Sequence, residues 1–237
     1  MYAKLPLAVA TLAALTTAAP ISMSASTKRT NTDSYTYYTG NGSNAAGWPA
    51  MTSWGTWDQL WNTNLPLIQQ SCGWNNWGAN DSSDEIANIK AAITAQASAS
   101  GIDQRFILAI MMQESKGCVR VPTTGNGVTN PGLMQSHDGA GTCAGVNPCP
   151  KAEITQMIKD GVSGTSSGDG LKQTVAQGTS DVGSETARAY YIGARIYNSG
   201  SVDLSNLDDG LGSTACYASD VANRLTGWAL AASSCTA

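Results

Sequence analysis

One glutamate ends a run of apolar residues and has the setting of a general acid. The segment FILAIMMQESKG occupies positions 106–117, and Ile107, Ile110 and Met111 stand seven, four and three residues before Glu114. Residues at these spacings share one face of a helix, so Glu114 continues an apolar stripe. Burial against that stripe disfavours the carboxylate and raises the pKa of the side chain. A carboxyl group that keeps its proton at mildly acid pH can protonate a leaving group.

An ordinary glutamate of a last helical turn, paired with Lys116 or Arg120, would show the same spacing, so other residues must decide. The chain continues with Gly-Leu-Met-Gln at 132–135 and Tyr-Asn-Ser-Gly at 197–200. In this order and at these separations, the glutamate and the two segments resemble the goose-type lysozymes and soluble lytic transglycosylases, glycoside hydrolase family 23 and its relatives. In that family a helix ends in Glu-Ser, a loop leads to Gly-Leu-Met-Gln, and a later helix ends in Ala-Tyr-Asn-x-Gly. The resemblance covers roughly residues 82–230.

The resemblance implies a mainly α, lysozyme-like α+β fold: a helical domain with a cleft and a long irregular loop stapled by disulfides. It implies that Glu114 protonates the glycosidic oxygen. It also implies that Tyr197 and Asn198 face the scissile bond from the end of their helix, with the tyrosine hydroxyl orienting Glu114 or the substrate. The substrate-binding residues that we expect are Ser115, Met134, Gln135, His137, Tyr190, Tyr197 and Asn198.

Three of these residues also fit a structural role. Tyr190 shares a helical face with Ala194 and Tyr197, so it either lines the cleft wall or packs in the core. Met134 would serve equally as a filler of the core. His137 is either a sugar contact or a loop residue whose ring is satisfied by its neighbours.

The second carboxylate departs from the family pattern. Goose-type members that hydrolyse carry one acidic residue in the loop before Gly-Leu-Met-Gln and another just after it. Residues 115–131 contain neither Asp nor Glu, and Asp138 is displaced by one position. Inverting hydrolysis needs a second carboxylate about 6.5–9.5 Å from the acid, and Asp138 is our candidate. An aspartate that caps its own loop is the alternative. The reaction would then resemble lytic transglycosylation, in which the substrate's own hydroxyl attacks and a 1,6-anhydro sugar forms.

We therefore expect a muramidase that cleaves the β-1,4 bond between N-acetylmuramic acid and N-acetylglucosamine of bacterial peptidoglycan. A chitinase on the same scaffold is the nearest alternative, because both polymers offer N-acetylated pyranoses. A non-catalytic glycan-binding protein is the alternative from another class.

The helices that must position these residues follow from apolar periodicity and stop signals. We expect helices at about 54–65, 82–100, 103–115, 151–160, 171–177, 184–200 and 219–228, and no strand of any length. Pro66 should limit the first, and Gly161 should end the fourth. Ser82 with Glu85 three positions later resembles a capping box. Residues 119–150 are rich in Gly, Pro, Thr and Asn and should form an irregular loop.

The chain also divides by composition. Residues 30–81 form a tryptophan-rich N-terminal arm, which we expect to pack on a lysozyme-like catalytic domain at 82–237. Trp54, Trp57 and Trp61 fall at i, i+3 and i+7, on one helical face. That face either packs on the main domain or stacks on sugar rings.

The first residues predict export rather than fold. Lys4, the apolar stretch LPLAVATLAAL and the small residues that follow have the layout of a secretory signal peptide at 1–19. Residues 20–29 end in Lys-Arg, a pair that kexin-type proteases cut, so we expect a propeptide there unless the pair arose by chance. The expected location is extracellular.

Cysteine content and charge limit the partners. Six cysteines in a secreted chain favour three disulfides, and the fifteen pairings stay open. We expect no metal or other cofactor, because the sequence has no C-x-x-C spacing and a single histidine. With 13 basic and 17 acidic residues and no basic stripe, neither nucleic acid nor an anionic membrane is an expected partner. We expect a monomer that binds an N-acetylated polysaccharide.

Overall fold

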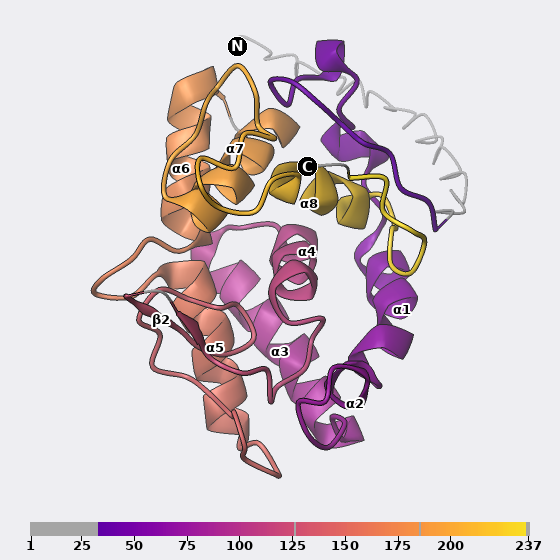
Figure 1. Cartoon of the computed structure of the whole chain (residues 1–237), viewed down its shortest axis with the longest axis vertical. Helices are drawn as coiled ribbons and strands as arrows, with labels where there is room; N and C mark the ends of the chain where they lie inside the picture. The colour runs from indigo at the N-terminus through magenta and orange to yellow at the C-terminus, as the bar shows by residue number, and fades with distance from the viewer. Residues whose placement is uncertain (1–32, 126, 185, 236–237) are drawn as a thin grey trace, which may run out of the picture.

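The computed structural model describes residues 33–125, 127–184 and 186–235, and this part of the chain is mainly helical (Figure 1). The predicted signal peptide at 1–19 and propeptide at 20–29 lie outside the described residues. The α-helices are α1 (Trp57–Ile68), α2 (Ser71–Trp74), α3 (Ser83–Ser100), α4 (Gln104–Glu114), α5 (Lys151–Ser163), α6 (Leu171–Val182), α7 (Ala187–Ser199) and α8 (Tyr217–Leu225). Short 3-10 helices occupy Asn44–Ala46 and Met51–Ser53, and the two-residue strands β1 (Thr124–Gly125) and β2 (Thr129–Asn130) pair antiparallel. The predicted mainly helical fold class is confirmed.

Local capping explains where two of these helices begin. Before α3, the Ser82 hydroxyl accepts the Glu85 N–H at 3.2 Å, and the Glu85 carboxylate accepts the Ser82 N–H at 2.7 Å. Thr56 and Gln59 make the same reciprocal pair before α1. Each pair satisfies two backbone donors that a helix start leaves open. None of the helices described is both long enough and apolar enough to cross a membrane.

α4 carries the candidate acid and lies near the middle of the molecule (Figure 1). It packs against α1, α3 and α8, and every side chain from Phe106 to Met112 is buried. The helix ends at Glu114, and the chain then turns through left-handed backbone at Lys116 and Gly117. An inner helix that is apolar on all sides thus delivers one carboxyl group at its end.

The N-terminal arm shares the core of the helical body. Trp48 and Trp54 are buried in the same apolar cluster as α4 and α7, and the Trp54 indole N–H donates to the Tyr191 hydroxyl at 2.9 Å. The Tyr35 hydroxyl donates to Asp220 of α8 at 2.6 Å. In Figure 1 this segment runs beside α8, at the opposite end of the chain. These contacts make the arm and α8 one packed unit.

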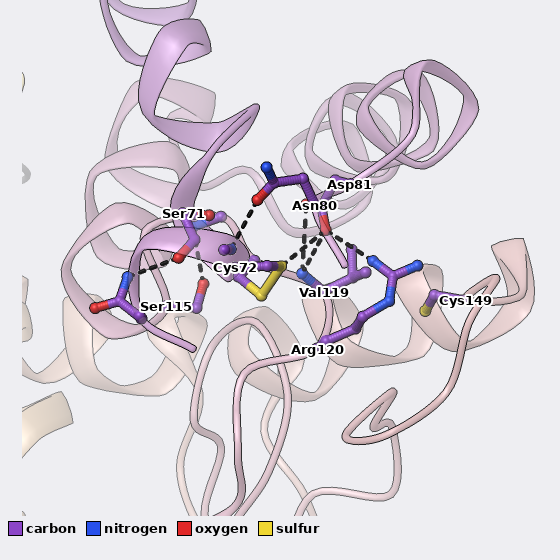
Figure 2. The surroundings of a disulfide bond; sticks show 12 residues. Ser71, Cys72, Asn80, Asp81, Ser115, Val119, Arg120 and Cys149 are labelled. Atoms are coloured by element: carbon purple, nitrogen blue, oxygen red, sulfur yellow. Dashed lines mark hydrogen bonds and ion pairs between the residues drawn. A yellow bond between two sulfur atoms is a disulfide. The ribbon is translucent and has the colours of Figure 1, made fainter. Parts of the chain in front are cut away.

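Three disulfides staple the described residues, as the cysteine count predicted. Their pairs are Cys72–Cys118, Cys143–Cys149 and Cys216–Cys235. The first joins α2 to the segment after α4, beside Asp81 and Arg120 (Figure 2). Disulfides of this kind persist in oxidising compartments.

The Gly-Leu-Met-Gln segment is fixed by close packing on α5. Leu133 and Met134 are fully buried. A Cβ at Gly161 of α5 would lie 2.3 Å from the Met134 Cβ, so a side chain there would displace the segment. Gly132 has φ +75° and stands equally close to Met157 of α5, since a Cβ there would approach the Met157 Cγ to 2.6 Å. Glycines at contact points therefore set the distance between loop and helix.

Several predicted boundaries need correction. α5 continues through Gly161 to Ser163, because Gly161 is a packing contact rather than a stop. α1 continues two residues past Pro66, where the proline costs one hydrogen bond close to the helix end. α6 extends to Val182, beyond the predicted end at 177, and α8 begins at Tyr217. The short helix α2 carried no periodic signal.

Candidate active site

A pocket of about 650 Å³ lies at the end of α4. Glu114 lines it, together with Gln135 and His137 of the irregular loop and with Tyr197 and Asn198 at the end of α7. The β1–β2 hairpin, the loop before α6, α6 itself, further residues at the end of α7 and Thr214 supply the rest of the lining. Five of the predicted site residues are thus brought to one cavity from three separate stretches of the chain.

The Glu114 carboxyl is half-buried, and its surroundings favour the protonated form. Burial raises the pKa of Glu114 to about 7, while the Tyr217 hydroxyl and the charge of Lys116 act in the opposite direction. The Tyr217 hydroxyl, from the start of α8, donates to Glu114 Oε1. Burial lowers the pKa of Lys116 to about 8, and its ammonium donates to the Gln113 carbonyl at 3.1 Å. A protonated Glu114 at mildly acid pH can act as a proton donor.

Tyr197 lines the pocket, but its hydroxyl is engaged elsewhere. It donates to the Met134 carbonyl at 2.8 Å and so ties α7 to the Gly-Leu-Met-Gln segment. Burial, together with the nearby charge of Glu114, raises the pKa of Tyr197 above its usual range. The orienting hydrogen bond to Glu114, which we expected from Tyr197, comes from Tyr217 instead.

Asn198 is oriented by the fully buried guanidinium of Arg195. Arg195 donates from one nitrogen to Asn198 Oδ1 and from the other to the Thr214 carbonyl at 2.9 Å. Because Oδ1 already accepts this bond, Nδ2 is the atom of the amide that can donate to a ligand in the pocket. Asn198 is therefore suited to hold an acceptor such as a sugar carbonyl or hydroxyl.

Gln135 contributes to the shape of the pocket through internal bonds. Its Oε1 accepts from the Thr124 hydroxyl at 2.7 Å, and its Nε2 donates to the Gly132 carbonyl at 3.0 Å. The oxygen of the side-chain amide thus joins the Gly-Leu-Met-Gln turn to the β1–β2 hairpin, and its nitrogen closes the turn itself. His137 is partly exposed at the rim, with its Nε2 3.8 Å from a carboxylate oxygen of Asp138.

The structure corrects the expectation for three substrate-binding residues. Ser115 is fully buried, and its hydroxyl caps the end of α4 by donating to the Met111 carbonyl at 3.1 Å. The Met134 side chain fills the core beside α5. Tyr190 packs edge-on against Phe106, with ring centroids 5.0 Å apart. None of the three lines the pocket, since each side chain points into the packed interior.

Asp138 also stands outside the pocket lining. Its carboxylate accepts the Thr129 N–H at 3.2 Å and the Thr129 hydroxyl at 3.1 Å, and these bonds hold the pKa of Asp138 below its usual value. Its own N–H donates to the Thr129 carbonyl at 2.7 Å. The Asp138 side chain therefore caps the turn that carries β2. This arrangement agrees with the alternative of an aspartate that caps its own loop.

The sequence did not predict two side chains at or near the pocket, Tyr217 and Asp169. Tyr217 lies 103 positions from Glu114, and no local pattern links the two. Asp169 lines the pocket from the loop before α6. It is the one charged residue in the Gly/Ser-rich stretch 161–170, and that isolation was a usable signal.

One group in the described residues has the spacing of metal ligands, but its chemistry does not fit a metal. The ligand atoms of Cys72, Asp81 and Cys118 lie within 4.8 Å of one another. The two sulfurs are bonded to each other, which removes the thiolates that a metal ion would need.

Comparison of the chain with protein-family models, curated proteins and solved structures finds no match. The function must therefore be argued from the residues and the geometry of the pocket.

Replacing Tyr217 with phenylalanine should shift the pH dependence of Glu114. The hydroxyl lowers the pKa of Glu114, so its loss should raise that pKa and move the basic limb of the profile to higher pH. Losing this bond should also reduce kcat/KM about tenfold. The measurement is kcat/KM against pH, with Tyr37→Phe as the control, because Tyr37 is exposed. An unmoved basic limb in Tyr217→Phe would show that the hydroxyl does not act on Glu114.

Proposed function

We propose that this protein is a secreted muramidase, and that Glu114 supplies the proton that cleaves the glycosidic bond. The observation that carries the proposal is one carboxyl group with a raised pKa, in a pocket lined also by Gln135, Tyr197 and Asn198. These residues belong to the motifs that resemble the goose-type lysozymes and lytic transglycosylases. A lysozyme-like fold is part of the proposal.

The pocket chemistry suits a sugar polymer. Its lining is rich in amide and hydroxyl groups, including the amides of Asn130, Gln177 and Asn198. Such groups recognise the hydroxyl and N-acetyl substituents of a pyranose, and the volume of about 650 Å³ is that of a ligand site. Three disulfides fit a protein that works outside the cell.

In the proposed reaction the polymer lies with a β-1,4 linkage against Glu114. The carboxyl proton passes to the glycosidic oxygen as the bond from the anomeric carbon to that oxygen breaks. Positive charge develops on the sugar ring, and the new carboxylate of Glu114 stabilises it. Water or the substrate's own hydroxyl then attacks the anomeric carbon, giving a reducing end or a 1,6-anhydro end.

A digestion experiment tests this function. Purified protein is incubated with bacterial peptidoglycan and, separately, with chitin oligomers at pH 5, and the products are read by mass spectrometry. We expect muropeptides from peptidoglycan and at least about tenfold slower release from chitin, an effect of the size of one missing substrate contact. Faster release from chitin would reassign the enzyme as a chitinase. Binding to either polymer without release of any fragment would make the protein a glycan-binding module.

A further inference from the structure

The pocket contains a second carboxyl group that no motif pointed to. Among the described residues that line it, the carboxylic acids are Glu114 and Asp169. Asp138, the acid that the family pattern suggested, is held by Thr129 outside the lining. Asp169 is exposed to solvent, so it keeps contact with water, whereas Glu114 is half-buried at the end of α4.

The loop that carries Asp169 is closed and tightly packed. Thr165 donates its N–H to the Gly168 carbonyl at 2.9 Å, and its hydroxyl accepts the Gly168 N–H at 3.0 Å. A Cβ at Gly170 would lie 2.2 Å from the Gly164 nitrogen, so the two ends of the loop touch. The backbone on either side of Asp169 is therefore held in one conformation, directly before α6 begins at Leu171.

The same loop is docked on the irregular loop that carries His137. The Thr165 hydroxyl donates to the His137 carbonyl at 2.7 Å. A Cβ at Gly168 would lie 2.5 Å from the His137 Cβ, so only glycine permits this approach. Asp169 thus lines the pocket from a loop that is fixed against the loop of the Gly-Leu-Met-Gln segment.

We propose that Asp169 is the catalytic base that activates water in this pocket, so that the enzyme hydrolyses its substrate with inversion. The proposal rests on the proposed function, because it needs Glu114 as the acid. Two acids in different settings divide the work: the half-buried one donates a proton, and the solvated one accepts a proton.

The step balances without any further reactant. Glu114 transfers its proton to the glycosidic oxygen, and the bond between that oxygen and the anomeric carbon breaks. A water oxygen forms the new bond to the anomeric carbon from the opposite face of the ring, and Asp169 takes the proton that this water releases. The products are an alcohol and a hemiacetal of inverted configuration. Glu114 then regains a proton from solvent, and Asp169 gives one up.

The test compares three variants on peptidoglycan. Asp169→Asn should lower the hydrolytic rate about 10²–10³-fold, the range for loss of a general base. Asp181→Asn, which changes an exposed aspartate at the far end of α6, should leave the rate within about threefold, as a surface substitution should. Asp138→Asn should likewise keep activity. Circular dichroism and thermal midpoints confirm that each variant is folded.

A chemical rescue distinguishes a base from a structural residue. Azide is a nucleophile that needs no base to activate it. Added sodium azide should therefore restore turnover in Asp169→Ala and give a glycosyl azide of inverted configuration. A merely structural role for Asp169 would give no such product.

Four results would overturn the proposal. They are an unchanged rate in Asp169→Asn, loss of activity in Asp138→Asn instead, no glycosyl azide from Asp169→Ala, or wild-type products with 1,6-anhydro ends alone. The fourth result would leave the muramidase function intact, because the glycosidic bond is still cleaved. It would exclude Asp169 as a base, because no water attacks in that reaction. If the wild type cuts neither peptidoglycan nor chitin, the proposed function itself has failed and this inference with it.

Discussion

Replacing Glu114 with glutamine should lower kcat/KM on peptidoglycan by about 10³-fold or more, because the variant has no proton to donate. The amide has nearly the same shape, so binding to the polymer should persist. Rates follow from muropeptide release, and binding from cosedimentation with insoluble peptidoglycan. Glu153→Gln is the matched control, since Glu153 lies on α5 and is absent from the pocket lining. Cleavage by Glu114→Gln at the wild-type rate would remove the proposed mechanism.

The same variant should change how stability depends on pH. The pKa of Glu114 is about 7 in the folded protein and about 4.5 for a free side chain. A raised folded pKa contributes stability that is fully present below pH 4.5 and lost as the pH rises through 7. The thermal midpoint of Glu114→Gln should therefore fall less than that of the wild type between pH 4.5 and 8. Parallel curves would show that the carboxyl is not desolvated.

Replacing Arg120 with methionine should destabilise the fold by about 3–5 kcal/mol at pH 7, the cost of leaving buried charge unpaired. The Arg120 guanidinium is almost fully buried and contacts Asp81 at 3.2 Å and Glu85 at 2.5 Å. Figure 2 shows it directed at Asp81 beside the Cys72–Cys118 disulfide. It also donates to Asn147 at 2.6 Å, so it joins the start of α3 to the loop closed by Cys149.

The destabilisation caused by Arg120→Met should be smaller at acid pH. Burial raises the pKa of Asp81 to about 7, so Asp81 takes up a proton as the pH falls and no longer needs its cation. Burial also disfavours the Glu85 carboxylate, but the N–H groups of Ser82 and Cys149 and the Arg120 guanidinium outweigh it and lower that pKa. The loss in Arg120→Met should thus be smaller at pH 5 than at pH 8.

Urea unfolding at pH 5 and at pH 8 measures the loss of stability in Arg120→Met. Arg105→Met is the control, because the Arg105–Asp103 pair at 2.6 Å keeps about a fifth of each side chain exposed, and a partly exposed pair costs less to break than a fully buried one. Equal losses in the two variants would mean that the Arg120 cluster adds little.

Local rules predicted the parts of the fold that depend on neighbouring residues. The Ser82–Glu85 capping box and the left-handed stop at Gly101 lie within one helix, so the sequence carries the whole signal. Gly161 was misread because its contact with Met134 is long-range, and Pro66 was misread because a proline so close to the helix end costs only one hydrogen bond.

The candidate site was also predictable only where the signal was local. Periodicity was enough to place Glu114 at the inner end of its helix. Motif membership did not show which way a side chain points, and so Ser115 and Met134 were assigned to the pocket although they face the interior. Tyr217 could not be found at all, since its contact with Glu114 spans 103 positions and leaves no periodic trace.

The contacts between the N-terminal arm and α8 also determine when the molecule can finish folding during biosynthesis. Thr36 and Tyr38 find their hydrogen-bond partners at Asn223 and Ser219, 187 and 181 positions later. A chain emerging from the ribosome exposes the arm long before those partners arrive. Tyr217 belongs to the same late segment, so Glu114 acquires its hydroxyl partner only after a further 103 residues have been synthesised. A nascent or truncated chain therefore lacks the assembled acid.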